Sequence, residues 1–327
     1  MRLRHPADWR TLLWACVLAP GLASLSYARP ALAPWLCWAH AYLALACGVI
    51  AHNHNHSPTF TGKRANEAFG NWLSLFYGYP TFAWIPTHNL NHHKYVNRPG
   101  DATITWRLTR RHTLPMALVY FFVSAYWQSE PIREFIRKAR ERQPSLYRRI
   151  LGEYALWLGV DVALLALAIA LHGWATGTVT FLLVTAIPSV FALWTIMFFN
   201  YEQHVDADPW SRYDHSRSWT GRLVNFLLFN NGLHAAHHEL AGAHWSTLPE
   251  LHARLAPHID PRLVERGLTW YLVKQYVLAP FAPRFGTVQV GRPAWEAQGP
   301  AERPAGTASV DVAEAGTNAE RSLEPAG

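Results

Sequence analysis

The chain has 327 residues, of which 50% are apolar and 13% are aromatic, whereas only 16% are charged. A charged fraction so far below the roughly 25% of soluble proteins excludes an ordinary soluble domain and indicates a membrane protein. The net charge of +7 fits basic loops on one side of a membrane better than a nucleic-acid partner, and three cysteines without close spacing exclude a disulfide framework.

Four stretches are long and apolar enough to cross a bilayer, which takes about 17–25 residues. In chain order they are residues 11–28, 31–51, 154–171 and 179–199. Two weaker apolar stretches, 69–86 and 114–127, indicate interfacial or re-entrant helices. The Ala-, Pro- and Gly-rich segment after 284 has no apolar periodicity, which predicts a membrane domain over 1–284 and a disordered tail over 285–327.

Charge predicts the orientation of these spans. If the spans alternate, the N-terminus, the long middle loop and the C-terminal region share one side, and 28 of the 29 Lys and Arg residues lie there, all but Arg29. The positive-inside rule makes that side cytoplasmic. A signal peptide ending at Ala28 is the competing interpretation, but Arg29-Pro30 makes a poor cleavage site. We therefore expect an all-α, multi-pass membrane protein with four transmembrane helices and both termini in the cytoplasm.

Histidines gather where the predicted spans end. The clusters are His52-Asn-His54-Asn-His56, His88-Asn-Leu-Asn-His92-His93 and His234-Ala-Ala-His237-His238, and Asn200 precedes His204 by four residues. Because residues four apart share one face of a helix, His52 pairs with His56 whereas His54 points away. The same spacing places His88 on the face of His92. In the third cluster the spacing i, i+3, i+4 places His234, His237 and His238 on one face.

These clusters suit metal ions. Imidazole is a ligand for Fe, Zn, Cu and Ni. Nine histidines, His204 included, are too many for one ion and suit two. No cysteine lies among them, which argues against an iron–sulfur cluster. The residues alone therefore predict a two-metal site with nitrogen ligands, carried by a cytoplasmic helical cap at one end of the spans.

The pattern HX3H, HX3HH, HX2HH resembles the three histidine boxes of the membrane fatty-acid desaturase superfamily, which includes hydroxylases and related oxidases. The resemblance covers about residues 52–255, including the four-span topology. It implies two Fe ions, with O2 as the co-substrate. Nine histidines would hold these ions: His52, His56, His88, His92, His93, His204, His234, His237 and His238.

Two further residues match positions that matter in this superfamily. Asn200 matches an asparagine that reaches the metal centre through water. Asp101 matches an acidic residue after the second box, where a carboxylate either orients a ligand imidazole or pairs with an arginine. The segment 214–217, Asp-His-Ser-Arg, indicates a solvated loop rather than a headgroup contact.

The resemblance implies a fatty-acyl desaturase that acts on a fatty acyl chain or a free fatty acid within the bilayer. No carrier sequence is fused to the chain, so electrons come from a separate ferredoxin-like carrier with its reductase. Hydroxylation and decarboxylation to a terminal alkene are alternative outcomes in the same superfamily. A zinc-dependent membrane hydrolase and a non-catalytic metal transporter are more distant alternatives, because nine nitrogen ligands suit a hydrolase poorly and a transporter places ligands near the midplane.

Overall fold

The structure, a computed structural model, describes residues 2–296. The chain forms two compact units. Unit 1 contains the residues up to Trp84 together with Arg133–Ile196, and unit 2 contains Ile85–Ile132 and the described residues from Met197 onward. Helices α6 (Leu114–Arg142) and α9 (Ile187–His204) each run from one unit into the other.

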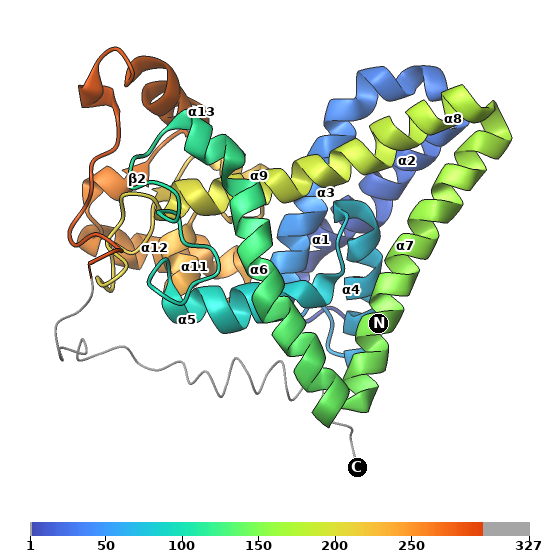
Figure 1. Cartoon of the computed structure of the whole chain (residues 1–327), viewed down its shortest axis with the longest axis horizontal. Coiled ribbons are helices and arrows are strands. Elements are labelled where there is room, and N and C mark those ends of the chain that lie inside the picture. The colour runs from blue at the N-terminus through green and yellow to red at the C-terminus, as the bar shows by residue number, and fades with distance from the viewer. Residues whose placement is uncertain (1, 297–327) are drawn as a thin grey trace. The chain divides into compact units, whose positions relative to one another are not determined.

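Unit 1 is built of long helices (Figure 1). They are α1 (Trp9–Leu12), α2 (Ala19–Ala28), α3 (Ala33–His56), α4 (Lys63–Tyr77), α7 (Pro144–His172), α8 (Trp174–Phe181) and the first part of α9, with π-helical segments at Leu13–Leu18 and Leu182–Ala186 and 3-10 turns at Pro6–Asp8, Pro30–Leu32 and Thr81–Ala83. Four continuous helices are long and apolar enough to cross a membrane: Pro6–Ala28, Pro30–His56, Pro144–His172 and Trp174–His204. The four stretches predicted as spans thus lie in four helices of sufficient length, and each helix is longer than its apolar stretch because polar residues continue it.

Prolines and a glycine mark where these helices begin. Three of the four start at a proline, whose fixed φ suits the first helical position and whose missing N–H is not needed there. The fourth follows Gly173, where a φ of 76° turns the chain between α7 and α8. A Cβ on Gly177 of α8 would lie 2.5 Å from the backbone of Ala168 in α7, so only glycine allows this close packing. Figure 1 shows α7 and α8 as a helical hairpin.

The outer surface of unit 1 is apolar, as a lipid environment requires. In the most apolar stretch of Pro144–His172 only 6% of the residues are buried, and Leu158 and Val162 are 52% and 66% exposed. Trp35 and Trp174 are 82% and 76% exposed, close to the ends of their spans, where tryptophan is favoured at membrane interfaces.

The two weaker apolar stretches differ from their prediction. The first is divided, because α4 ends at Gly78, which has a left-handed φ of 83°. The second does not end at 127: α6 continues to Arg142 as one helix of 29 residues. Its later half is polar but rich in helix-forming Arg, Lys, Glu and Ala, and Arg137 pairs with Glu134 and Glu141 on the exposed surface.

Unit 2 consists of shorter elements. Beside the parts of α6 and α9 they are α5 (His93–Tyr95), β1 (Ser218–Trp219), α10 (Arg222–Leu227), α11 (His234–Glu239), α12 (Leu248–Leu255), β2 (Val264–Glu265) and α13 (Leu268–Val273), with π-helical segments at Ile85–His92 and Lys274–Leu278 and 3-10 turns at Trp245–Thr247, Ala256–His258, Pro261–Leu263 and Pro283–Phe285. The strands β1 and β2 pair in parallel. The described chain is otherwise helical wherever it is regular, as the all-α prediction requires.

The core of unit 2 lies behind the third histidine cluster. Ala235 and Ala236 of α11 are fully buried and pack with Leu248 and Leu263. The small alanine side chains let α11 lie close to this core, which fixes the direction of its histidines.

The predicted tail begins inside unit 2. Val290 and Ala294 are both only 3% exposed, and the backbone N–H of Val290 donates to the carbonyl of Asp206. Residues 285–296 therefore have a defined place in the fold. The rest of the predicted tail, 297–327, lies outside the described residues.

Candidate metal centre

Four histidines of unit 2 direct their Nε2 atoms to one point. His204, at the end of α9, lies 3.0 Å from His92 and 2.9 Å from His234, measured between Nε2 atoms. His238 lies 3.1 Å from His234 in the same way. The ligand atoms of all four lie within 4.8 Å of one another, and three of the rings are buried.

Hydrogen bonds fix the protonation of two of these rings. Nδ1 of His92 lies 2.9 Å from a carboxylate oxygen of Asp101, and Nδ1 of His204 lies 3.1 Å from the carbonyl oxygen of His215. A carbonyl only accepts, and an ionised carboxylate only accepts, so each Nδ1 carries the proton. When both rings are neutral, as metal ligands must be, their Nε2 atoms present lone pairs to each other at 3.0 Å. Such an arrangement is repulsive without a cation between them.

Both carboxylate oxygens of Asp101 accept hydrogen bonds. They accept from the backbone N–H of Asn97 at 2.6 Å, and from the backbone N–H and the hydroxyl of Thr103 at 2.7 Å each. Burial raises the pKa of Asp101, but its interaction with His92 and the hydrogen bonds from Thr103 outweigh burial and lower the pKa to about 2. Of the two roles expected for Asp101, contact with a histidine ring is the one found.

The turn that carries Asp101 has unusual backbone geometry. Val96 and Asn97 both have a left-handed φ, 45° and 62°, which is costly for a β-branched residue such as valine. Gly100 has a φ of 104°, and a Cβ there would lie 2.8 Å from the ring of Tyr95. Asn97, 2% exposed, also donates from Nδ2 to the carbonyl of His204 at 3.1 Å, so one turn joins the second box to α9.

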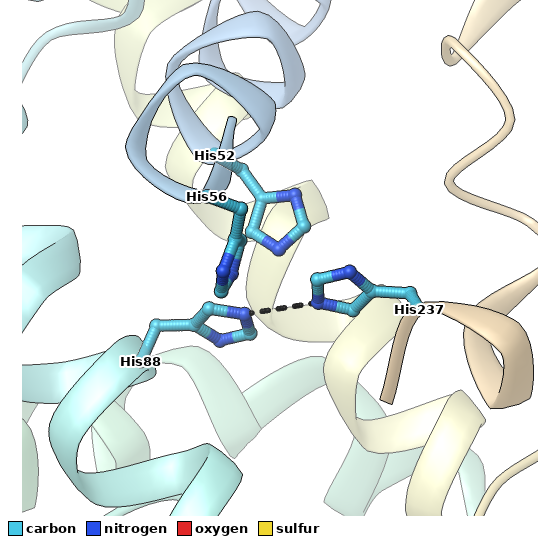
Figure 2. Close-up of side chains that lie close together, drawn as sticks. All are labelled: His52, His56, His88 and His237. Carbon is cyan, nitrogen blue, oxygen red and sulfur yellow. Dashed lines mark hydrogen bonds between the residues drawn. The ribbon is translucent and has the colours of Figure 1, made fainter. Parts of the chain in front are cut away.

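Three other histidines of unit 2 form a second group. The Nε2 atom of His93 lies 3.0 Å from those of His88 and His237. The Nε2 atoms of His88 and His237 lie 3.4 Å from each other, the contact dashed in Figure 2. His88 was expected to pair with His92, four residues on. Its Nε2 atom instead lies 3.0 Å from that of His93, because Ile85–His92 is a π-helix, whose i to i+5 geometry brings residues five apart together. His92 thus joins the first group and His93 the second.

The first box lies at the end of α3 in unit 1. His52 and His56 are one turn apart, with ring centroids separated by 4.8 Å, and Figure 2 shows their rings side by side. His54 faces elsewhere, as expected: its Nδ1 lies 3.0 Å from the hydroxyl of Thr59 and its Nε2 lies 3.1 Å from the carbonyl of Asn66. Both ring nitrogens of His54 are therefore occupied by protein groups.

The donor set fits a transition metal. All ligand atoms in the two groups of unit 2 are imidazole nitrogens, which suit Fe and Zn rather than Mg or Ca. Burial, together with the charges of neighbouring histidines, holds the pKa of His238 well below its ordinary value. The ring is therefore neutral, as a metal ligand must be.

Asn200 lies near this centre through a polar chain. Its Nδ2 donates to the hydroxyl of Tyr120 at 2.9 Å, and that hydroxyl donates to the carbonyl of Thr103 at 2.5 Å. Tyr120 is fully buried on α6. The chain links Asn200 to the residue that holds Asp101, and nothing in the local sequence around Tyr120 indicated such a role.

The segment expected to be a solvated loop is buried. His215, Ser216 and Arg217 are 9%, 0% and 1% exposed. The carbonyl of His215 fixes the ring of His204, and Arg217 donates to the carbonyl of Glu202 at 2.5 Å. The expectation was wrong because the charged side chain finds backbone acceptors inside the unit.

Glu202 itself is fully buried. Its carboxylate accepts from His112 at 3.1 Å, from Tyr271 at 2.7 Å and from Tyr276. Glu202 therefore ties α9 to α13 and to the π-helical segment that follows α13.

Comparison with known proteins agrees with the site. A family model described as fatty acid desaturase matches residues 29–270. Searches of curated proteins and of solved structures gave no match. The matched range includes all three histidine clusters and His204.

Proposed function

Because the chain belongs to the fatty acid desaturase family, and is thus an oxidoreductase of a membrane, we propose that it desaturates a fatty acyl chain with O2 and electrons from a separate carrier. The observation that carries this proposal is the pair His92 and His204, whose Nε2 atoms lie 3.0 Å apart while each Nδ1 faces an acceptor, an arrangement suited to holding a metal ion.

The proposed ligand set is the nine histidines expected from the sequence. Four form the first group of unit 2, three form the second, and His52 and His56 complete the set. Two bound iron ions would supply the activation of O2 that removes hydrogen from an unactivated C–H bond. If the site bound zinc instead of iron, the protein would be a hydrolase, and hydrolysis needs a base that activates water.

The residues around the ligands hold them in the form that binds metal. Asp101 keeps a proton of His92 on Nδ1, and the carbonyl of His215 does the same for His204, so that in the neutral rings Nε2 is the nitrogen left to bind metal. Asn200, held by Tyr120, is proposed to contact the centre through water. The basic loops favour a cytoplasmic position for this centre and for both termini.

Incubation with labelled substrates tests the proposal. Membranes containing the chain are incubated with an isotope-labelled fatty acid or acyl thioester and a reductant, with and without O2. The masses of the products are then measured by mass spectrometry. Loss of two hydrogens only with O2 is the expected result. Gain of one oxygen would make the protein a hydroxylase, and loss of CO2 would make it an alkene-forming decarboxylase. Two zinc ions in active protein would overturn the redox proposal.

A further inference from the structure

Arginines and tryptophans cover one surface of unit 2. Arg98 and Arg292 both lie over the ring of Trp210, with 5.5 Å and 5.1 Å to its centroid. Arg110 lies 5.2 Å from the ring of Trp295, and that ring meets Trp106 edge-on at 6.4 Å. We call these residues, together with the exposed Arg111, the arginine–tryptophan surface.

The surface has unbalanced positive charge. Among the described residues, no carboxylate lies within ion-pair distance of Arg98, Arg110 or Arg111, whereas Arg292 pairs weakly with Glu296 at 3.9 Å. Trp106, Arg110, Arg111 and Trp295 also line a small pocket together with the buried Asn97. Asp206 lines the same pocket, but its carboxylate contacts His112 and the hydroxyl of Thr287. A basic, aromatic surface with a hollow suits an acidic protein partner better than an apolar one.

Hydrogen bonds lead from this surface to the histidine cluster. Trp106 donates from Nε1 to the carbonyl of Asn97 at 3.0 Å. The N–H of Asn97 donates to Asp101 at 2.6 Å, and Asp101 accepts from His92 at 2.9 Å. Three hydrogen bonds therefore join a surface indole to a ring of the cluster.

We propose that the arginine–tryptophan surface is where an acidic one-electron carrier protein docks, and that Trp106 and Asn97 connect it to His92. This inference rests on the proposed function. In each encounter the carrier loses one electron and the metal centre gains one. Two such transfers and two solvent protons balance desaturation, since O2 takes two hydrogens from the substrate and becomes two waters.

Binding of a carrier tests the docking site without turnover. The full chain in lipid nanodiscs is titrated with an acidic [2Fe–2S] ferredoxin at ionic strengths of about 0.01 M and about 1 M, where charges are screened over about 30 Å and about 3 Å. The double substitution Arg110→Glu and Arg111→Glu should weaken binding about tenfold at low salt and have little effect at high salt.

The control removes the same charge elsewhere in unit 2. Arg222 and Arg266 are exposed and lie outside the surface, and their double substitution to Glu should change the affinity less than twofold. Equal losses in both double variants, or none in either, would overturn the docking site. Lipid headgroups and the acidic residues of 297–327 are the other candidate occupants of this surface. If either were the true occupant, the double substitution of Arg110 and Arg111 would leave the ferredoxin affinity unchanged or increase it, which would contradict the proposal.

The connection is tested by Trp106→Phe, which keeps an aromatic ring but loses the donor to Asn97. Ferredoxin affinity should stay within twofold while the rate of ferredoxin oxidation in a single turnover falls about tenfold. An unchanged rate would remove Trp106 from the path. Failure of the proposed function is seen separately, because wild-type chain given dithionite and O2 would then form no product.

Discussion

The Nε2 atoms of His92 and His204 lie 3.0 Å apart, although both rings carry their proton on Nδ1. In neutral rings, the form that binds metal, the two lone pairs at this distance repel each other, whereas a cation placed near them binds both. The pair comes from segments 112 residues apart, so the fold itself brings this repulsion about.

Removal of metal should destabilise the protein. An ion bound only by the folded state contributes about 2.7 kcal/mol at a free concentration 100 times its Kd. Thermal unfolding in nanodiscs should therefore shift to lower temperature when a strong chelator is added, and elemental analysis of untreated protein should give two iron ions per chain. An unchanged unfolding temperature together with no bound metal would contradict the assignment.

Replacement of Asp101 should weaken metal binding. In Asp101→Asn the amide donor can face Nδ1 of His92, which favours the tautomer with the proton on Nε2. Loss of such a partner typically lowers metal affinity or activity about 10–100-fold. Asp260→Asn is the matched control, since within residues 2–296 the side chain of Asp260 forms hydrogen bonds only with Arg262. Equal metal affinity in the two variants would exclude an orienting role for Asp101.

His54 and His56 should respond differently to substitution by alanine. Loss of His54 leaves Thr59 and Asn66 without their partner and should cost about 1–3 kcal/mol of stability, while two metal ions remain bound. Loss of His56 should reduce the metal content without a comparable loss of stability in the metal-free protein. Metal analysis and denaturation of both variants check this. If His54→Ala lost metal and His56→Ala kept it, the ligand set would be wrong.

Tyr120→Phe should slow the reaction. Without the hydroxyl, the carbonyl of Thr103 and the amide of Asn200 both lose a buried partner, and the position of Asn200 is no longer fixed. Product formation should fall about tenfold with the metal content retained. The control is Tyr126→Phe on the same helix, where Tyr126 is 72% exposed. The same rate in both variants would show that the Tyr120 hydroxyl has no part in the reaction.

The His112 ring should make stability depend on pH. Burial lowers its pKa, but the negative charges of Glu202 and Asp206 and hydrogen bonds to them outweigh burial, so its pKa is raised above the ordinary value. Because the pKa of His112 is higher in the folded state, its protonation stabilises the folded protein, fully so at a pH below the pKa of about 6.5 in the unfolded chain. This stabilisation is lost as the pH rises through the pKa of the folded state. The difference in unfolding free energy between wild type and His112→Gln should therefore shrink from about pH 6 to alkaline pH. A constant difference would contradict this.

Much of the site follows from local spacing. The i, i+4 interval of His52 and His56 fixes their shared face on any α-helix, and the four spans follow from apolar length alone. The orientation of His54 was also predicted, since residue i+2 points away. By contrast, the local geometry of Ile85–His92 was not predictable. A π-helix has hydrogen bonds between residues five apart instead of four, and it has no sequence pattern of its own.

The sequence by itself determined the membrane character, the four spans and the histidines available to bind metal, because these depend on composition and on spacing within single helices. Only the tertiary structure decided which histidines face one another. It set His92 against His204, gave Asp101 a ring to hold, and buried Arg217 where a solvated loop was expected. Such pairings depend on packing between segments far apart in the chain, and no local pattern of residues encodes them.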